Sequence, residues 1–226
     1  FDLDGTLYDS VESAMVARSK IFDYASERCK GLDSYKFQEA YDEIWEEVEK
    51  EYARMILELG IGEREIRLEH MRQVLHACGF YDSHLARELV NVYWEERRRA
   101  LRLFPETLPV LSSLRRSYKL SLLTNGPSDW QREKINDLEI ADFSDHIVIG
   151  GEVGYVKPNP AIFNILLTKY SIPASQILYV GDNQERDVFG AYYSGLNVAW
   201  LNRKNEESKP DTPKPHYEIR SLKDLL

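Results

Sequence analysis

From Val11 to about Leu103, apolar residues recur three and four positions apart, which is the period of an amphipathic helix. No stretch in this block alternates as a half-buried strand would. Asp33 and Ser34 suit the first position of a helix, and the glycines at 31, 60 and 79 suit helix ends. The pattern therefore predicts a small bundle of helices over residues 11–29, 34–59, 64–77 and 84–101.

After Pro105, short apolar runs alternate with amphipathic segments. The apolar runs predict buried strands over Lys119–Leu123, His146–Ile149, Ile177–Val180 and Asn197–Leu201. The segments between them predict helices over Pro109–Arg116, Ser128–Leu138, Ala161–Tyr170 and Glu185–Ser194. This alternation is typical of an α/β fold in which helices cover a parallel sheet.

The opening residues, Phe1 to Asp4, look like the end of a buried strand, so we expect further apolar residues upstream in the full protein. Because this strand precedes the helical block, the block is predicted to be inserted between the first strand and the rest of one sheet. Residues 1–10 and 104–226 would form the α/β core domain, and residues 11–103 the helical domain. Asn202 to His216, rich in Lys, Glu and Pro, predicts a solvated loop.

Composition narrows the class of protein. The 226 residues are 43% apolar, enough to bury a core, and the formal net charge of −9 argues against a nucleic-acid binder. The two cysteines, Cys29 and Cys78, cannot supply a disulfide framework, and no apolar run reaches membrane-spanning length. We therefore expect a cytoplasmic protein that does not act on membranes.

Ligands of open parallel sheets bind at the carboxyl ends of the strands, so polar residues just after each predicted strand are candidates. Each such group also has an ordinary interpretation, as a turn, a helix cap or a solvated lysine. Together these groups predict that carboxylates, a hydroxyl and a lysine converge at one edge of the sheet. Two carboxylates as close as Asp2 and Asp4 require a cation or a shared proton between them. The groups are Asp2-Leu3-Asp4-Gly5-Thr6, Thr124-Asn125-Gly126, Lys157-Pro158, and Gly181-Asp182 with Asp187.

These motifs, in this order, resemble those of the haloacid dehalogenase superfamily, and specifically of its phosphatase branch. Asp2-x-Asp4-Gly5-Thr6 matches the first motif, Thr124 the second, Lys157 the third, and Asp182 with Asp187 the fourth. The helical block lies where that family carries its helical (C1-type) cap. The resemblance implies a Rossmann-like parallel sheet core with an inserted all-α cap, which closes over the core site and chooses the leaving group.

The resemblance also implies roles for the motif residues. Asp2 would attack a phosphate monoester and form an aspartyl-phosphate, while Asp4 would act as acid and then base. Thr124, Asn125 and Lys157 would bind the phosphoryl group. Mg²⁺ would be bound by the Asp2 carboxylate, the Asp4 backbone carbonyl and Asp182, with Asp187 supporting them. Four carboxylates against one lysine would otherwise repel a phosphate ester.

Several alternatives differ in the residues they need. Haloacid dehalogenases characteristically lack the second acid, which is present here as Asp4, so that reaction is disfavoured. A phosphomutase of the β-phosphoglucomutase kind uses the same four motifs and stays open. A noncatalytic binding protein is disfavoured because every motif residue is intact. A phosphonate hydrolase would need a lysine in the cap. The candidate lysines are better explained as solvated charges on helices: Lys20, Lys30, Lys36 and Lys50.

The helical block also bears on the substrate. It carries 15 Glu and 4 Asp against 10 Arg and 4 Lys, a net charge of −5 between Val11 and Leu101, which suits a small monophosphate. Triose phosphates, phosphoglycolate, small sugar phosphates and nucleoside monophosphates all remain candidates. The aromatic residues of the block are predicted to be mostly core at their helical spacing: Tyr24, Tyr41, Trp45, Tyr52, Tyr93 and Trp94.

Overall fold

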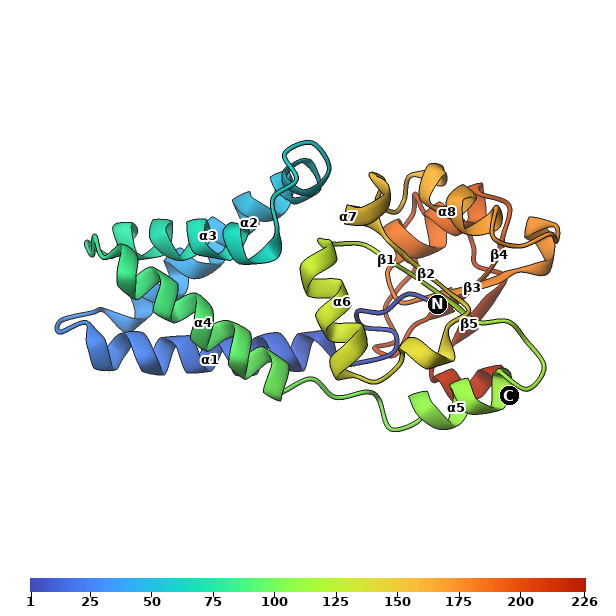
Figure 1. Ribbon diagram of the computed structural model, residues 1–226, viewed down its shortest axis with the longest axis horizontal. Helices are drawn as coiled ribbons and strands as arrows, with labels where there is room; N and C mark the ends of the chain where they lie inside the picture. Colours follow the sequence, from blue (N-terminus) through green and yellow to red (C-terminus); the bar gives the residue numbers. More distant parts are fainter. The chain divides into compact units, whose positions relative to one another are not determined.

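The computed structural model describes residues 1–226, and the chain divides into two units, each with its own core (Figure 1). One unit contains residues 10–101 and is entirely helical. The other contains residues 1–9 and 102–226 and holds all five strands. None of the helices combines the length and the apolar composition that crossing a membrane requires.

The helical unit has four helices, as the sequence pattern predicted. In chain order they are α1 (Ser10–Arg28), α2 (Ser34–Leu57), α3 (Glu63–Ala77) and α4 (Ser83–Arg99). Two of them begin at aspartate caps: Asp33 accepts hydrogen bonds from the backbone of Tyr35 and Lys36, and Asp82 does the same for α4. Helix α1 packs along α4 and α2 along α3 (Figure 1). Small buried residues on α1, Ala17 and Ala25, allow the close approach to α4.

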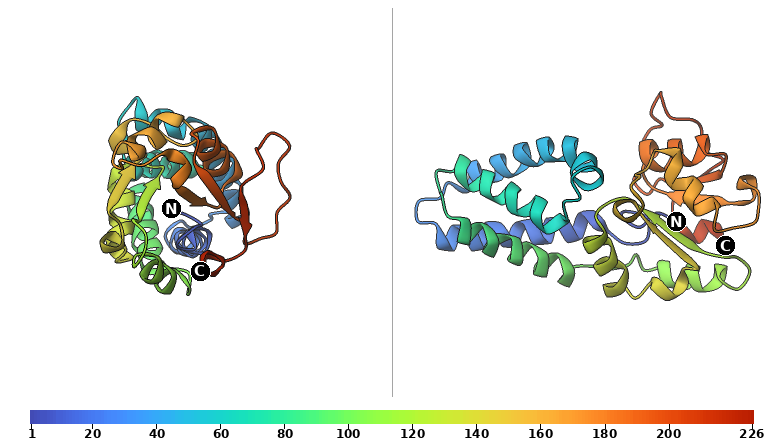
Figure 2. Two further views of the ribbon diagram at one scale, coloured as in Figure 1. Left: turned by 90° about the vertical axis from the view of Figure 1, so that its right-hand side faces the viewer. Right: turned by 45° about the horizontal axis from the view of Figure 1, so that its top comes forward.

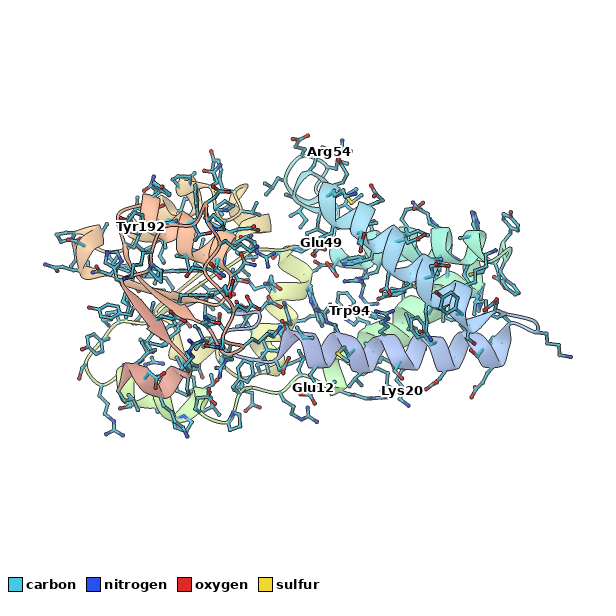
Figure 3. The ribbon with its side chains drawn as sticks, turned by 180° about the vertical axis from the view of Figure 1, so that it is seen from behind. Glu12, Lys20, Glu49, Arg54, Trp94 and Tyr192 are labelled. Atoms are coloured by element: carbon cyan, nitrogen blue, oxygen red, sulfur yellow. The ribbon has the colours of Figure 1, made fainter.

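The candidate lysines and most of the aromatic residues of this unit are distributed as expected. The candidate cap lysines are all solvent-exposed, and Lys20 points away from α1 (Figure 3). The phosphonate hydrolase alternative therefore has no buried lysine in this unit to support it. Most of the aromatic residues belong to apolar clusters, and Trp94 is 2% exposed. They are structural residues of the bundle.

The sheet of the second unit is parallel throughout. Strand β1 (Ser121–Thr124) pairs with β2 (His146–Ile149), and β4 (Asn197–Leu201) lies between β3 (Leu178–Gly181) and β5 (Tyr217–Ile219). The first residues of the chain join the two groups of strands. Leu123 N donates to Phe1 O (2.9 Å), and Asp2 N donates to Val180 O (2.8 Å). Asp2 therefore lies between the carboxyl ends of β1 and β3.

Helices cover both faces of this sheet (Figure 1). Leu123 of β1, Phe163 of α8 and Trp200 of β4 belong to one buried apolar cluster. Because both faces are covered, the strands β3 and β4 are largely apolar rather than alternating, whereas the edge strand β5 keeps two exposed residues. The helices are α5 (Thr107–Leu114), α6 (Ser128–Asp137), α7 (Gly150–Val153), α8 (Pro160–Leu167) and α9 (Phe189–Tyr193).

The structure differs from the sequence-based prediction at three places. The helix predicted over 185–194 is a π-helical segment, Gln184–Val188, followed by α9. The one-turn helix α7 and the three-residue strand β5 were not predicted, since neither is long enough to show a period. The predicted loop at 202–216 is present between β4 and β5 and extends from the sheet (Figure 2).

Candidate active site

The Lys157 ammonium lies among the predicted motif residues. Its Nζ donates to Asp2 Oδ1 (2.5 Å), Asp187 Oδ1 (2.6 Å) and the hydroxyl of Tyr179 (2.9 Å). The tyrosine hydroxyl in turn donates to Leu123 O of β1 (3.1 Å). Lys157 is only 4% exposed, so these three partners replace the water that a lysine normally keeps. Residues 155 positions apart in the chain are thereby brought into contact.

Burial and crowding change the acidity of the carboxyl groups here. Burial, with smaller contributions from the neighbouring carboxylates, raises the pKa of Asp2 from 3.8 to about 6, although Lys157 opposes this. Burial and the Asp2 charge raise the pKa of Asp182 from 3.8 to about 7. Burial lowers the pKa of Lys157, but Asp187 and Asp2 outweigh it and the pKa rises, so the ammonium form is retained. One lysine therefore does not balance the local negative charge.

Three acidic residues form a cluster that fits a divalent cation. Carboxylate oxygens of Asp2, Asp182 and Asp187 all lie within 4.8 Å of one another. Carboxylate oxygens are the ligands that Mg²⁺ prefers, and a cation would relieve the repulsion that raises the first two pKa values. Thr6 Oγ1 donates to Asp182 Oδ1 (3.2 Å), and the backbone N–H of Asn183 donates to Asp187 Oδ2 (3.0 Å). These bonds orient the carboxylates of the cluster.

Two glycines permit the close approach of these carboxylates. Gly5 has φ +80°, and a Cβ there would lie 2.4 Å from Asp182 Oδ2. A Cβ at Gly181 would lie 2.4 Å from the carboxylate carbon of Asp187. Any side chain at Gly5 would meet both a backbone penalty and a clash. The glycines of the first and fourth motifs are therefore required by packing around the acids.

The loop after β1 is tied to the loop that carries Lys157. Asn125 Nδ2 donates to Lys157 O (3.0 Å), and Lys157 N donates to Asn125 Oδ1 (2.7 Å). The Asn125 side chain, predicted to bind phosphate, thus also holds the loop that carries Lys157 in place. Thr124, which is 1% exposed, lies at the end of β1 and accepts a hydrogen bond from Gln131 Nε2 (2.5 Å).

The surroundings of Asp4 include residues that the sequence analysis did not identify. Lys134 Nζ donates to both Asp4 oxygens (2.5 and 2.7 Å), Gln131 Nε2 donates to Asp4 Oδ2 (3.0 Å), and the Tyr8 hydroxyl donates to Oδ1. Burial alone would raise the pKa of Asp4, but the Lys134 ammonium and these donors hold it well below its usual range. These donors therefore stabilise the carboxylate form of Asp4 in this structure.

A sequence signal for Lys134 does exist. Trp130, Gln131, Lys134 and Ile135 are the buried residues of α6, at the spacing of one helical face. Gln131 and Lys134 on an otherwise apolar face indicate that polar side chains are buried in contact with a polar group. The pattern does not indicate which group that is.

The family of the chain follows from comparison with known proteins. Residues 1–195 match the model of the haloacid dehalogenase-like hydrolases. Because this match covers most of the chain, the protein belongs to that family and is a hydrolase. Its α/β core with a helical unit is the architecture that the resemblance of the motifs implied.

Curated relatives within the family are phosphatases. The chain is 38% identical over 142 residues to a phosphoserine phosphatase of Thermus thermophilus, a match covering 62% of this chain and 56% of that protein. It is 31% identical over 230 residues to a glyceraldehyde 3-phosphate phosphatase of Pyrococcus abyssi, covering 100% of this chain and 90% of that protein. These similarities support classification of the chain as a phosphatase.

The fold is shared more widely than the activity. A solved 2-haloacid dehalogenase of Pseudomonas syringae superposes with a TM-score of 0.72 at 26% identity, covering 100% of this chain and 94% of that chain. Overall architecture therefore does not separate phosphate-ester from carbon–halogen hydrolysis. The distinction has to come from the site residues, and Asp4 is the informative one.

Proposed function

We propose that this hydrolase is a Mg²⁺-dependent phosphatase that cleaves a small phosphate monoester through an aspartyl-phosphate on Asp2. The observation that carries the proposal is the cluster of Asp2, Asp182 and Asp187 around the Lys157 ammonium. It combines a nucleophilic carboxylate, ligands for a hard cation and a fixed positive charge. The phosphatases among the relatives support the same reaction class.

Asp2 is the nucleophile in this proposal. Its Oδ1 is bound to Lys157, and its other oxygen attacks phosphorus in line while the ester oxygen leaves on the opposite side. Water then attacks phosphorus, releases inorganic phosphate and restores the Asp2 carboxylate. Lys157 stays protonated throughout, so it offsets the charge of the nucleophile and of the phosphoryl oxygens.

Asp4 donates a proton to the leaving oxygen in the first step and removes one from water in the second. Since its carboxylate form is stabilised in this structure, the proton must be gained when the substrate binds. The negative charge of a phosphate ester favours that protonation, because like charges raise the pKa of a carboxyl group. The presence of Asp4 favours phosphate esters over haloacids.

The phosphoryl oxygens are bound by Thr124 Oγ1, by the backbone N–H groups that follow it, and by Lys157. A cation would be bound by the carboxylates of Asp2 and Asp182 and the backbone carbonyl of Asp4, with Asp187 orienting them. When bound, Mg²⁺ supplies positive charge that lets a dianionic substrate enter a site rich in carboxylates. The helical unit, residues 10–101, is proposed to act as the cap that selects the leaving group.

The substrate class is a small phosphorylated metabolite. The relatives are named for phosphoserine and glyceraldehyde 3-phosphate, and the net negative charge of the helical unit disfavours polyphosphorylated substrates. A phosphomutase would use the same residues. The two differ in whether a sugar bisphosphate stimulates turnover, as it would for a mutase, or leaves it unchanged.

The test is a screen for phosphate release. Phosphoserine, glyceraldehyde 3-phosphate, phosphoglycolate, hexose monophosphates, nucleoside monophosphates and p-nitrophenyl phosphate are each incubated with the protein, with EDTA or with Mg²⁺. We expect turnover of at least one metabolite that depends on Mg²⁺, and inhibition by beryllium fluoride, which mimics a phosphorylated aspartate. Absence of metal-dependent release from every ester would overturn the proposal.

A further inference from the structure

A second buried lysine, Lys134, lies in the same unit and binds the other acid of the first motif, Asp4. Lys134 of α6 is 1% exposed, and both hydrogen bonds described for its ammonium end on Asp4. The ammonium lies 5.5 Å from the ring centroids of both Tyr8 and Trp130. Lys134 therefore lies among aromatic rings and binds the Asp4 carboxylate.

Gln131 connects this carboxylate to the phosphate-binding end of β1. Its Nε2 donates to Asp4 Oδ2 (3.0 Å) and to Thr124 Oγ1 (2.5 Å). Gln131 and Lys134 are three residues apart, so they extend from the same face of α6. Since Tyr8 also donates to Oδ1, every oxygen of the Asp4 carboxylate has two donors and its orientation is fixed.

Stability alone does not account for this arrangement. Replacing a buried ion pair by apolar residues of similar volume is often neutral or stabilising, because two charges must be removed from water. Moreover, the pair is asymmetric: the Lys134 side chain is 2% exposed, whereas the Asp4 side chain keeps 34% of its exposure. The lysine is thus buried, whereas the carboxylate that it binds remains accessible to solvent. This is the arrangement expected of a buried residue that supports an accessible catalytic group.

We propose that Lys134 and Gln131 are positioning residues that hold the Asp4 carboxyl in the orientation needed for proton transfer to the leaving oxygen. The proposal rests on the function proposed above. Lys134 fixes the carboxyl from the α6 side, and Gln131 sets its distance from Thr124. Proton transfer requires that distance and direction to be correct, so loosening Asp4 slows departure of the leaving group more than substrate binding.

The experiment compares leaving groups of similar shape and different basicity. The rate of phosphorylation is measured with p-nitrophenyl phosphate, whose leaving group needs little protonation, and with phenyl phosphate, whose leaving group needs it strongly. The variants are Lys134→Met, Lys134→Arg and Gln131→Leu. Lys119→Met is the matched control, since it breaks a lysine–aspartate pair (Lys119 with Asp145, 3.2 Å) at the surface of the same unit.

We expect Lys134→Met to lower kcat/KM for phenyl phosphate by about 100-fold, mainly through kcat, and for p-nitrophenyl phosphate by about tenfold or less. Lys134→Arg should recover part of the loss, and Gln131→Leu should show the same dependence on the leaving group. Lys119→Met should match wild type with both esters. Circular dichroism and thermal unfolding establish that each variant is folded.

Equal losses with both esters in a folded Lys134→Met protein would overturn the proposal, because a merely structural lysine affects both alike. If Lys134→Met does not fold, Gln131→Leu decides by the same comparison. Absence of metal-dependent phosphate release from these two esters and from every metabolite of the screen would instead contradict the proposed function itself. The two failures are therefore distinguishable.

Discussion

Asn125 and Lys157 are joined by two hydrogen bonds that run in opposite directions between the Asn125 amide and the Lys157 backbone. The pairing sets the position of the backbone from which the Lys157 ammonium reaches Asp2 and Asp187. An asparagine after one strand thus fixes a lysine that follows another. We therefore expect Asn125, which follows Thr124 of the second motif, to act by positioning Lys157 of the third motif.

Asn125→Ala should therefore lower activity by displacing Lys157. We expect kcat/KM to fall by about 100-fold, the effect of misplacing a reacting group by roughly 1 Å. Asn159→Ala is the control, because Asn159 caps α8 by accepting a hydrogen bond from Ala161 and should cost about 1 kcal/mol of stability with little loss of activity. Steady-state kinetics and urea unfolding of both variants check this. Similar activity losses in both would contradict the proposed link.

Asp2→Asn should abolish turnover without unfolding the protein. The amide has nearly the volume of the carboxylate, and it removes one charge from a cluster in which burial and neighbouring carboxylates already disfavour the charged form of Asp2. We expect kcat to fall by about 1000-fold or more, as for loss of a covalent nucleophile. Thermal unfolding should stay near that of wild type. Activity above a thousandth of wild type would mean that Asp2 is not the nucleophile.

The contribution of Asp2 and Asp182 to the stability of the metal-free protein should fall as pH rises through neutrality. Asp2 and Asp182 have pKa values of about 6 and about 7 in the folded protein, above 3.8 in the unfolded chain. Between about pH 4 and pH 7 these two carboxyl groups therefore bind more protons in the folded state, and their contribution to the free energy of unfolding decreases with pH. Burial lowers the pKa of His70 from 6.5 to about 3 and that of the Phe1 amine from 8.0 to about 5, and these two groups contribute with the opposite sign. The pKa of Asp4 is lowered in the folded protein, so Asp4 stabilises the fold at every pH above the pKa that it has in the unfolded chain. Its contribution to the free energy of unfolding is therefore constant in this pH window.

The measurement is the urea midpoint in EDTA at pH 5.5 and pH 8. We compare wild type with Asp182→Asn, and we expect the change in midpoint from pH 5.5 to pH 8 to be more negative in wild type than in the variant. The stabilisation by Mg²⁺ should be largest at pH 8, where the carboxylates are ionised. The same pH dependence of the midpoint in wild type and Asp182→Asn would contradict the raised pKa of Asp182.

Gly5→Ala should impair the site, whereas Gly31→Ala should not. Both glycines have a positive φ (+80° and +82°), so both substitutions incur a backbone penalty of about 1–2 kcal/mol. Only at Gly5 does the new Cβ meet Asp182, at 2.4 Å, while the space around Gly31 is open. We expect a larger loss of stability in Gly5→Ala than in Gly31→Ala, because the clash adds to the backbone penalty, and weaker Mg²⁺ binding only in Gly5→Ala, measured by calorimetry. Equal Mg²⁺ affinities would show that Asp182 is not confined by Gly5.

The sequence by itself determined the order of the elements, because helical and strand periods are local. It also determined which residues follow the strands, and in parallel strands these residues share one edge of the sheet. For that reason Asp2, Lys157, Asp182 and Asp187, scattered along the chain, could be predicted to meet, and the structure places them together.

Only the tertiary structure decided the partners of these residues. Lys134 looks like any helical lysine until α6 packs with that face inward, and its contact with Asp4 spans 130 positions of the chain. The hydrogen bonds between the Asn125 side chain and the Lys157 backbone likewise depend on packing between two distant loops. Periodicity reveals which face of an element is buried, whereas the choice of partner depends on packing between distant segments, which no local pattern records.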